Sequence, residues 1–378
     1  MIPYGRQWVD EEDIQQVVQV LRSDWLTTGP SVERFEKAVA GFVGGKYGVA
    51  VSSGTAALHA AMDAANIGPG DEVIVPTMTF AATANAVVFQ GGRPVFADVH
   101  PNTLLIDPIQ VEAKITSRTK AIVAVDYAGQ PCDYDALRSI TKRHNLILMA
   151  DACHALGAEY KGRKVGTLAD LNVFSFHPVK CITTGEGGMV LTDEPEWAEK
   201  MRRFRNHGVS TDHRQRTNDG TWFYEMTDLG YNYRLTDFQC ALGLSQLRKL
   251  PTWIARRREI AREYDLAFAK LHAITSLDTS SDITHAYHLY VIRLEGAQER
   301  GGRSAIFETL RKEGMGVNVH YIPVHLHPFY RKRFGTHPGM CPIAEAAYEQ
   351  ILSLPIFPAM GDREVKEVIE AVRRAVEG

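Results

Sequence analysis

The sequence predicts an α/β protein with a mostly parallel central sheet flanked by helices, followed by a smaller α+β domain. Short apolar runs rich in β-branched residues, at 73–75, 122–125 and 146–149, alternate with helical stretches. This alternation is typical of a parallel sheet covered by helices. Longer helical patterns take over after about residue 191. The length, 378 residues, favours two domains over one.

Caps and apolar spacing mark the elements of the first part. Asp10 precedes apolar positions that recur at helical spacing to Leu21, which predicts a capped amphipathic helix. Ser31 begins another helix with Phe35, Val39 and Phe42 on one face. Further helices are expected over 57–65, 196–205 and 237–249, and further strands over 47–51 and 187–191.

A domain boundary is expected after Leu250-Pro251. It divides the chain into a large α/β domain, 1–250, and a small α+β domain, 251–378. Within the small domain we expect strands over 285–293 and 317–321 and a closing helix over 362–376.

Composition excludes several classes of protein. Hydrophobic residues make up 45% and charged residues 23%, as in ordinary globular proteins. The net charge is −3 with basic residues spread along the chain, so no nucleic-acid or membrane footprint is expected. Five cysteines without CxxC spacing disfavour a disulfide framework or a zinc knuckle. The absence of a signal-like or membrane-spanning apolar run favours the cytoplasm.

The segment Ser52-Ser53-Gly54-Thr55-Ala56 joins a predicted strand to a predicted helix. Such a junction points free backbone N–H groups and the positive end of the helix at one spot, which suits a phosphate. An N-cap built from small residues gives the same pattern, so the segment alone leaves both interpretations open.

Two further residues follow predicted strands. Asp151 comes after the apolar strand 146–149, at the sheet edge where α/β proteins bind ligands, although it suits an N-cap equally well. Lys180 lies between a strand and the glycine-rich stretch 183–188. A lysine in that setting is partly desolvated, which favours the neutral amine that forms a Schiff base, although most lysines are solvated surface charges.

Together these residues form the set that pyridoxal 5′-phosphate (PLP) requires. The set comprises a phosphate cradle, a carboxylate for the pyridine nitrogen at Asp151 and a Schiff-base lysine at Lys180. Phe80 lies just beyond another strand and is a candidate to cover the pyridine ring of PLP, although it could instead be an ordinary core phenylalanine.

Ordered motifs over nearly the whole chain resemble the DegT/DnrJ/EryC1/StrS family of sugar aminotransferases, which have the aspartate aminotransferase fold, type I. The motifs are Trp25-Leu26-Thr27-Thr28-Gly29-Pro30, Ser53-Gly54-Thr55-Ala56, 151–157, 175–188, Tyr231-Asn232-Tyr233-Arg234 and 320–325.

The resemblance implies a role for each site residue. It implies that Lys180 binds PLP covalently, that Asp151 pairs with the pyridine nitrogen and that His154 contacts the cofactor. It also implies phosphate contacts from Gly54, Thr55, Ala56 and Ser175, and from Asn232 of a partner subunit, and therefore a homodimer with active sites at the subunit interface.

The resemblance further implies transamination with L-glutamate as donor, 2-oxoglutarate as by-product and pyridoxamine phosphate as the aminated form of the cofactor. Dehydratases of the family carry histidine where Lys180 stands. The stretch 182–188 is most similar to members that act at C4. The opening 2–7 with 177–180 is most similar to the pseudaminic acid branch, which serves surface polysaccharides and whose substrate is a UDP-linked 2-acetamido-4-keto-6-deoxy hexose.

Tyr4, His177 and Tyr321 are then candidates for substrate contact. Alternatively, Tyr4 anchors the N-terminus, His177 is a hydrogen-bonded buried histidine and Tyr321 packs within the small domain. His320, His325 and His327 look like a metal cluster, but no matching carboxylate accompanies them, so no metal is expected.

Other functions remain as alternatives. They are amination at C4 of another nucleotide keto sugar, namely a UDP-4-keto-pentose or a GDP- or dTDP-4-keto-6-deoxyhexose, and a PLP-fold regulator without turnover. A nicotinamide oxidoreductase is disfavoured because 185–190 lacks the third glycine of GxGxxG and leads into a strand. The sequence contains no GxxxxGK[ST] loop, which excludes a P-loop nucleotidase.

Overall fold

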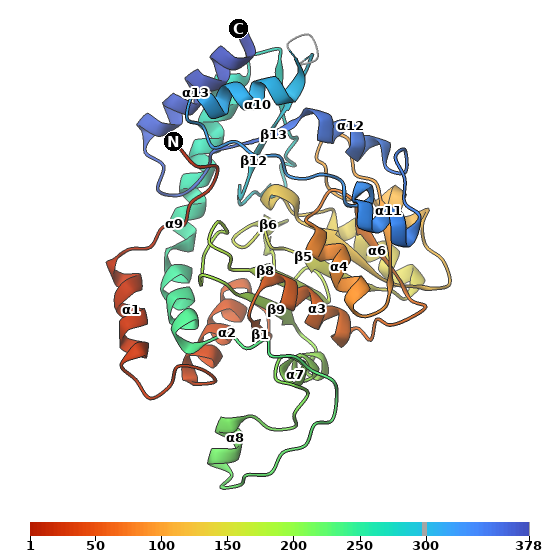
Figure 1. Cartoon of the computed structure of the whole chain (residues 1–378), viewed down its shortest axis with the longest axis vertical. Coiled ribbons are helices and arrows are strands. Elements are labelled where there is room, and N and C mark those ends of the chain that lie inside the picture. Colours follow the sequence, from red (N-terminus) through yellow and green to blue (C-terminus); the bar gives the residue numbers. More distant parts are fainter. Residues whose placement is uncertain (297–300, 378) are drawn as a thin grey trace.

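The computed structural model describes residues 1–296 and 301–377. Its central element is a seven-stranded sheet of order β1-β9-β8-β5-β4-β2-β3 with helices on both faces (Figure 1). Strands β3, β2, β4, β5 and β8 run parallel, and β9 is antiparallel to both of its neighbours. The predicted α/β class with a mostly parallel sheet is confirmed. The strands of this sheet are β1 (Tyr47–Val51), β2 (Glu72–Pro76), β3 (Arg93–Ala97), β4 (Thr119–Val125), β5 (Ile147–Asp151), β8 (Leu171–Ser175) and β9 (Gly188–Thr192).

The helices of the first part include every helix that the caps predict. Asp10 caps α1 in a reciprocal capping box with Asp13, and Pro30 begins α2, one residue before Ser31. The helices up to α8 are α1 (Glu11–Leu21), α2 (Pro30–Val43), α3 (Gly54–Ala64), α4 (Ala81–Phe89), α5 (Pro108–Glu112), α6 (Tyr134–His144), α7 (Pro195–Phe204) and α8 (His213–Asn218), with a 3-10 turn η1 (Tyr127–Gly129).

The C-terminal part adds a three-stranded antiparallel sheet of order β10-β12-β13. A third small sheet, β11-β6-β7, joins residue 284 to residue 159 of the first part. The remaining elements are β6 (Glu159–Tyr160), β7 (Arg163–Lys164), α9 (Asp237–Phe268), β10 (Ile274–Ser276), β11 (Ile283–Thr284), β12 (Tyr290–Leu294), α10 (Gly302–Lys312), η3 (Val324–Leu326), α11 (Pro328–Phe334), α12 (Pro342–Gln350), β13 (Ile351–Leu354) and α13 (Asp362–Glu377).

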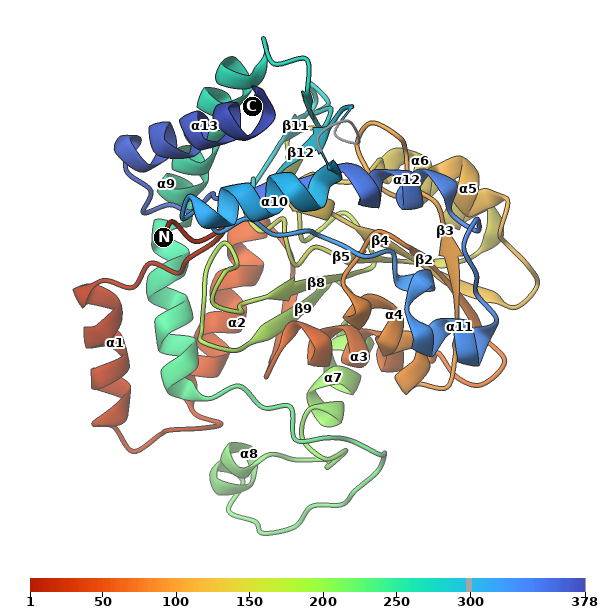
Figure 2. The same ribbon diagram turned by 45° about the horizontal axis from the view of Figure 1, so that its top comes forward.

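Helix α9 does not end at Lys249, as the sequence predicts, but continues through Pro251 to Phe268. A proline inside a helix removes one hydrogen bond and costs about 3 kcal/mol. Leu250, Trp253 and Ile254 are buried around it, and we infer that their packing offsets this cost. Figures 1 and 2 show α9 running from α1 and α2 towards α13 at the C-terminal end.

Two apolar cores accompany this arrangement. One surrounds the large sheet, and the other surrounds β12, β13 and the second half of α9. Ile2 belongs to the second core, because residues 1–3 cross to the C-terminal part and Ile2 pairs with Met315. The division at residue 250 falls inside α9 and stays a prediction.

The two C-terminal strands differ from their predicted bounds. Only residues 290–294 of the first form β12, and the segment 317–321 forms no strand. Asn318 makes a single bridge to Ser353, so this segment runs past the sheet towards the large domain. The closing helix forms as α13.

A glycine at the contact of α2 and α9 gives a test of this packing. A Cβ at Gly243 would lie 2.6 Å from Phe35 Cζ and 2.8 Å from Thr184 Cγ2. Gly243→Ala is expected to lower the free energy of unfolding by about 1 to 3 kcal/mol through overpacking. Denaturant titration measures this change in the free energy of unfolding. Gly41→Ala on α2 is the matched control, because nothing lies within 4 Å of its added Cβ, and it should leave stability equal or slightly higher. An unchanged free energy of unfolding in Gly243→Ala would contradict this packing.

Candidate functional site

A cavity of about 690 Å³ lies at the carboxyl ends of β1, β5 and β8. Ten of the twelve residues predicted from the sequence line it: Tyr4, Gly54, Thr55, Phe80, Asp151, His154, Ser175, His177, Lys180 and Tyr321. Ala56 and Asn232 are not among its lining residues. Residues that sequence reasoning missed also line it, including Cys153, Glu186, His288 and Asn318.

The first wall of the cavity is the start of α3. The Ser53 side chain caps this helix by accepting from the Ala56 N–H at 3.0 Å, so Ala56 lies buried behind the wall. No described residue accepts from the N–H groups of Gly54 and Thr55. A Cβ at Gly54 would lie 2.8 Å from Ser175 Cβ, so only glycine leaves this approach open. The wall is a cradle of free N–H groups at a helix N-terminus, which fits a phosphate group.

Asp151 forms the second wall, at the last residue of β5. Its side chain is buried, and Oδ2 accepts from the Thr83 hydroxyl at 2.7 Å. Thr83 Oγ1 also lies 2.7 Å from Thr79 Oγ1, so a short chain of hydroxyls fixes the carboxylate. Sequence reasoning missed Thr83 because it is an ordinary helix position of α4, and only the sheet brings it to β5.

His154 lies beside this carboxylate in the cavity wall. Its Nε2 is 3.1 Å from the Tyr321 hydroxyl, and its ring centroid is 4.3 Å from that of His288. Burial, together with the charge of Lys180, holds the pKa of His154 well below its usual value, so the ring is neutral. Its Nδ1 is buried and has no hydrogen-bond partner in the described ranges, which leaves one polar atom for a bound group.

Lys180 completes the set from the turn that follows β8. Its backbone N–H donates to His177 O at 2.9 Å, and no described residue forms a hydrogen bond or ion pair with its amine. Burial lowers the pKa of the Lys180 amine, although Cys153 and Asp151 act in the opposite direction. The amine is therefore closer to its neutral, nucleophilic form than that of an exposed lysine.

The other predicted residues form the rim. Phe80 is 60% exposed at the N-cap of α4, and its ring centroid is 6.0 Å from that of Tyr321. The carbonyl of Tyr4 accepts from the Ile356 N–H at 3.0 Å, which ties the N-terminal segment across the second core to the cavity. His177 is exposed at the rim. Asn232 is exposed and outside the cavity of its own chain.

The histidines of 320–327 are engaged elsewhere. His325 contacts Thr77 at 2.6 Å and Glu345 at 2.9 Å, and His320 Nδ1 contacts the Ser353 hydroxyl at 2.9 Å. No group of three potential metal ligands occurs in the part of the chain that the structure describes. In the same part, no helix has the length and apolar character to cross a membrane.

The cavity thus combines a phosphate cradle, a fixed carboxylate, a lysine of lowered pKa and a polar atom in need of a partner. Residues 7–373 match the model of the DegT/DnrJ/EryC1/StrS aminotransferase family. The chain belongs to this family.

Similar proteins span the whole chain. The spore coat polysaccharide biosynthesis protein SpsC of Bacillus subtilis is 44% identical, with 100% of this chain and 97% of SpsC covered. The sugar aminotransferase Spr1654 of Streptococcus pneumoniae in its pyridoxamine phosphate form superposes with a TM-score of 0.94 at 33% identity, covering 100% of this chain and 99% of Spr1654. Helicobacter pylori PseC, an aminotransferase in pseudaminic acid biosynthesis, gives 0.92 at 35% identity, with 100% and 99% covered.

The protein is a PLP-dependent sugar aminotransferase with the aminotransferase fold. Spr1654 occurs in PLP and pyridoxamine phosphate forms, and the cradle, carboxylate and lysine of this chain fit that cofactor. The predictions of family, fold and cofactor are confirmed.

Lys180→Ala gives the direct test of the lysine. Because the cradle and Asp151 remain, the variant is expected to bind PLP without a covalent link and to lose turnover by at least about 10³-fold, since a covalent anchor and a proton-transfer group are both absent. Borohydride reduction followed by gel filtration in denaturant measures the covalent link, because the reduced cofactor stays with the protein peak only where a lysine held it. Near-normal turnover in this variant would contradict the assignment.

Proposed function

We propose that the protein transfers the amino group of L-glutamate to C4 of a UDP-linked 2-acetamido-4-keto-6-deoxy hexose, for surface polysaccharide biosynthesis. The observation that carries the proposal is the convergence of Lys180, Asp151 and the α3 cradle in one cavity. Tyr4, His177 and Tyr321 line the same cavity and supply polar groups for a sugar. Likeness to PseC supports the pseudaminic-acid type of substrate, and likeness to SpsC supports a role in polysaccharide biosynthesis.

Each residue of the site has a defined role in this proposal. PLP, when bound, supplies an electron sink for the carbon that loses its proton. Gly54, Thr55 and Ser175 bind the phosphate, whereas the Ala56 N–H is already taken by Ser53. Phe80 covers the ring. Asp151 holds a proton on the ring nitrogen, and His154 hydrogen-bonds to the cofactor. Lys180 anchors the cofactor and, once displaced by the donor, moves the proton in both half-reactions.

We propose that the active unit is a homodimer in which Asn232 reaches the cofactor phosphate of the partner. Asn232 is exposed and is not among the residues that line the cofactor cavity of its own chain. The segment before it carries a series of exposed apolar side chains, which a second copy would cover: Trp222, Phe223, Tyr224, Met226, Leu229 and Tyr231.

We also propose that the enzyme works in the cytoplasm. All five cysteines are unpaired thiols, which suits a reducing compartment.

Amination of a panel of nucleotide keto sugars tests the substrate. With L-glutamate as donor, UDP-linked 2-acetamido-4-keto-6-deoxy hexoses are expected to give a 4-amino sugar and 2-oxoglutarate, measured by mass spectrometry. The value of kcat/KM should be at least about tenfold lower for a UDP-4-keto-pentose and for GDP- or dTDP-linked 4-keto-6-deoxyhexoses. The reason is that these sugars lose part of the binding energy that the preferred substrate gains in the transition state. Lys180→Ala is the control. No product from any sugar would refute the proposal, and preference for another nucleotide would correct the substrate.

A further inference from the structure

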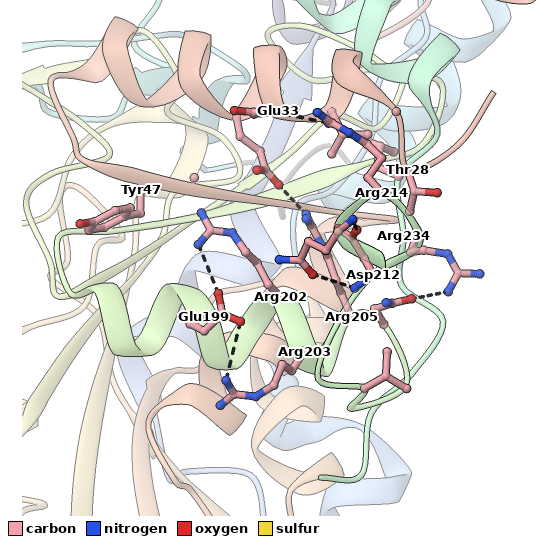
Figure 3. Close-up of a pocket in the computed structure, with 18 of the residues that line it drawn as sticks. Thr28, Glu33, Tyr47, Glu199, Arg202, Arg203, Arg205, Asp212, Arg214 and Arg234 are labelled. Atoms are coloured by element: carbon pink, nitrogen blue, oxygen red, sulfur yellow. Dashed lines mark hydrogen bonds and ion pairs between the residues drawn. The ribbon is translucent and has the colours of Figure 1, made fainter. Parts of the chain in front are cut away.

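Histidines, rather than arginines, accompany the amine in the cofactor cavity. Of the described residues that line it, Lys180 is the only lysine or arginine, whereas several arginines of α7 and α8 line a separate hollow of about 550 Å³ (Figure 3). His154, His288 and His320 line the cofactor cavity, and all three are buried. None of the roles proposed for the site uses His288.

The ring of His288 packs directly against that of His154. The two ring centroids are 4.3 Å apart, with an angle of 43° between the ring planes. The Nδ1 atoms of both rings are buried with no hydrogen-bond partner in the described ranges, so packing is what joins the two rings. The other contact of the His154 ring is with Tyr321, whose hydroxyl lies 3.1 Å from Nε2. Two residues of the C-terminal part therefore enclose His154.

Arg257 holds the backbone of His288 in place. It belongs to α9, and only 1% of it is exposed. Its Nη1 donates to the carbonyls of Tyr287 at 3.1 Å, His288 at 3.4 Å and Ile356 at 3.0 Å. Leaving these buried carbonyls and a buried guanidinium without partners would be costly, so the backbone at 287–288 is strongly fixed.

The turn η1 holds the same segment from the side of the large sheet. The N–H groups of residues 286 and 289 donate to carbonyls of η1 at 3.0 and 3.1 Å. A Cβ at Gly129, which has a φ of +103°, would lie 2.9 Å from His154 O and 3.1 Å from His288 N. The backbones of the two histidines thus meet across a glycine that leaves no room for a side chain.

Both histidines are neutral in this setting. Burial, followed by repulsion from neighbouring groups that can carry positive charge, holds the pKa of His288 well below its usual value. These groups are His154, Lys180, Arg257 and His320. Burial, with Lys180 and His320, lowers the pKa of His154 in the same way.

The other titratable groups that face His154 are uncharged. They are the Tyr321 hydroxyl and the Cys181 thiol, which lies 3.8 Å from the His154 carbonyl. Burial raises the pKa of both groups. Exclusion of water by the surrounding side chains is therefore what keeps His154 neutral.

We propose that His288 is a positioning residue for His154. Its ring, fixed by Arg257 and η1, excludes water from His154 and holds the imidazole in the orientation that contacts the cofactor. The inference rests on the proposed contact between His154 and PLP. His288 acts through His154 and touches neither the cofactor nor the sugar.

Two variants of His288 separate packing from chemistry. His288→Phe keeps an aromatic ring but removes both nitrogens, and His288→Ala removes the ring and admits water. His288→Ala is expected to raise the PLP dissociation constant about tenfold, measured by equilibrium dialysis, and His288→Phe should restore it to within about twofold of wild type. His272→Ala, which removes an exposed histidine outside the cavity, is the matched control and should bind PLP as wild type does.

The protonation state of His154 gives a readout that a merely structural role would not move. Long-range proton–nitrogen NMR spectra of holoenzyme labelled in its histidines follow each ring, and His154→Gln identifies the signal of His154. In wild type and His288→Phe this signal should not titrate between about pH 8 and 5.5. In His288→Ala water reaches the ring, so its pKa should rise towards about 6.5 and the protonated form should appear as the pH falls.

Specific outcomes would overturn the proposal. If His288→Phe binds PLP as poorly as His288→Ala, the nitrogens of His288 act on a ligand and the positioning role is wrong. If His288→Ala matches wild type in both measurements, His154 needs no such support. Where His288→Ala does not fold, His288→Gln takes its place, because it fills most of the space without a rigid ring and should show the same two changes.

Failure of the inference and failure of the proposed function give different results. Unchanged PLP affinity in His154→Gln would show that His154 has no role at the cofactor, and the role of His288 would fall with it. A wild-type holoenzyme that aminates no keto sugar would refute the proposed function, whatever the His288 variants do to PLP binding.

Discussion

The site depends on one constraint: a carboxylate and an amine must share a cavity without neutralising each other. Asp151 satisfies its oxygens through the Thr83 hydroxyl and the Cys153 N–H, at 2.7 and 3.3 Å. Lys180 forms no ion pair with a described residue, and burial lowers the pKa of its amine. The parallel sheet makes this possible because β5 and β8 deliver the two groups to the same edge on separate, rigid strands.

Other parts of the chain complete the cavity at this edge of the sheet. The close approach of β9 to α3 explains the glycine-rich stretch, since a Cβ at Gly188 would lie 2.3 Å from Ser53 O. The C-terminal part closes the cavity with Tyr321, and the N-terminal segment adds Tyr4 after crossing the second core.

Local patterns in the sequence predicted most of the fold and the centre of the site. Caps and apolar periodicity identify α1, α2 and most strands of the large sheet, although not β3, because each signal lies within about ten residues. The run of α9 through Pro251 could not be predicted, because burial of Leu250, Trp253 and Ile254 overrides a strong local signal. Thr83 and His288 were missed because they join elements far apart in the sequence and belong to no motif.

Chemical trapping of the cofactor linkage identifies the lysine that binds PLP. Borohydride reduction of the holoenzyme fixes the covalent bond between PLP and its lysine, and peptide mapping by mass spectrometry then locates the label. A phosphopyridoxyl group is expected on Lys180 alone. A label on any other lysine, or a holoenzyme that takes up none, would contradict this assignment.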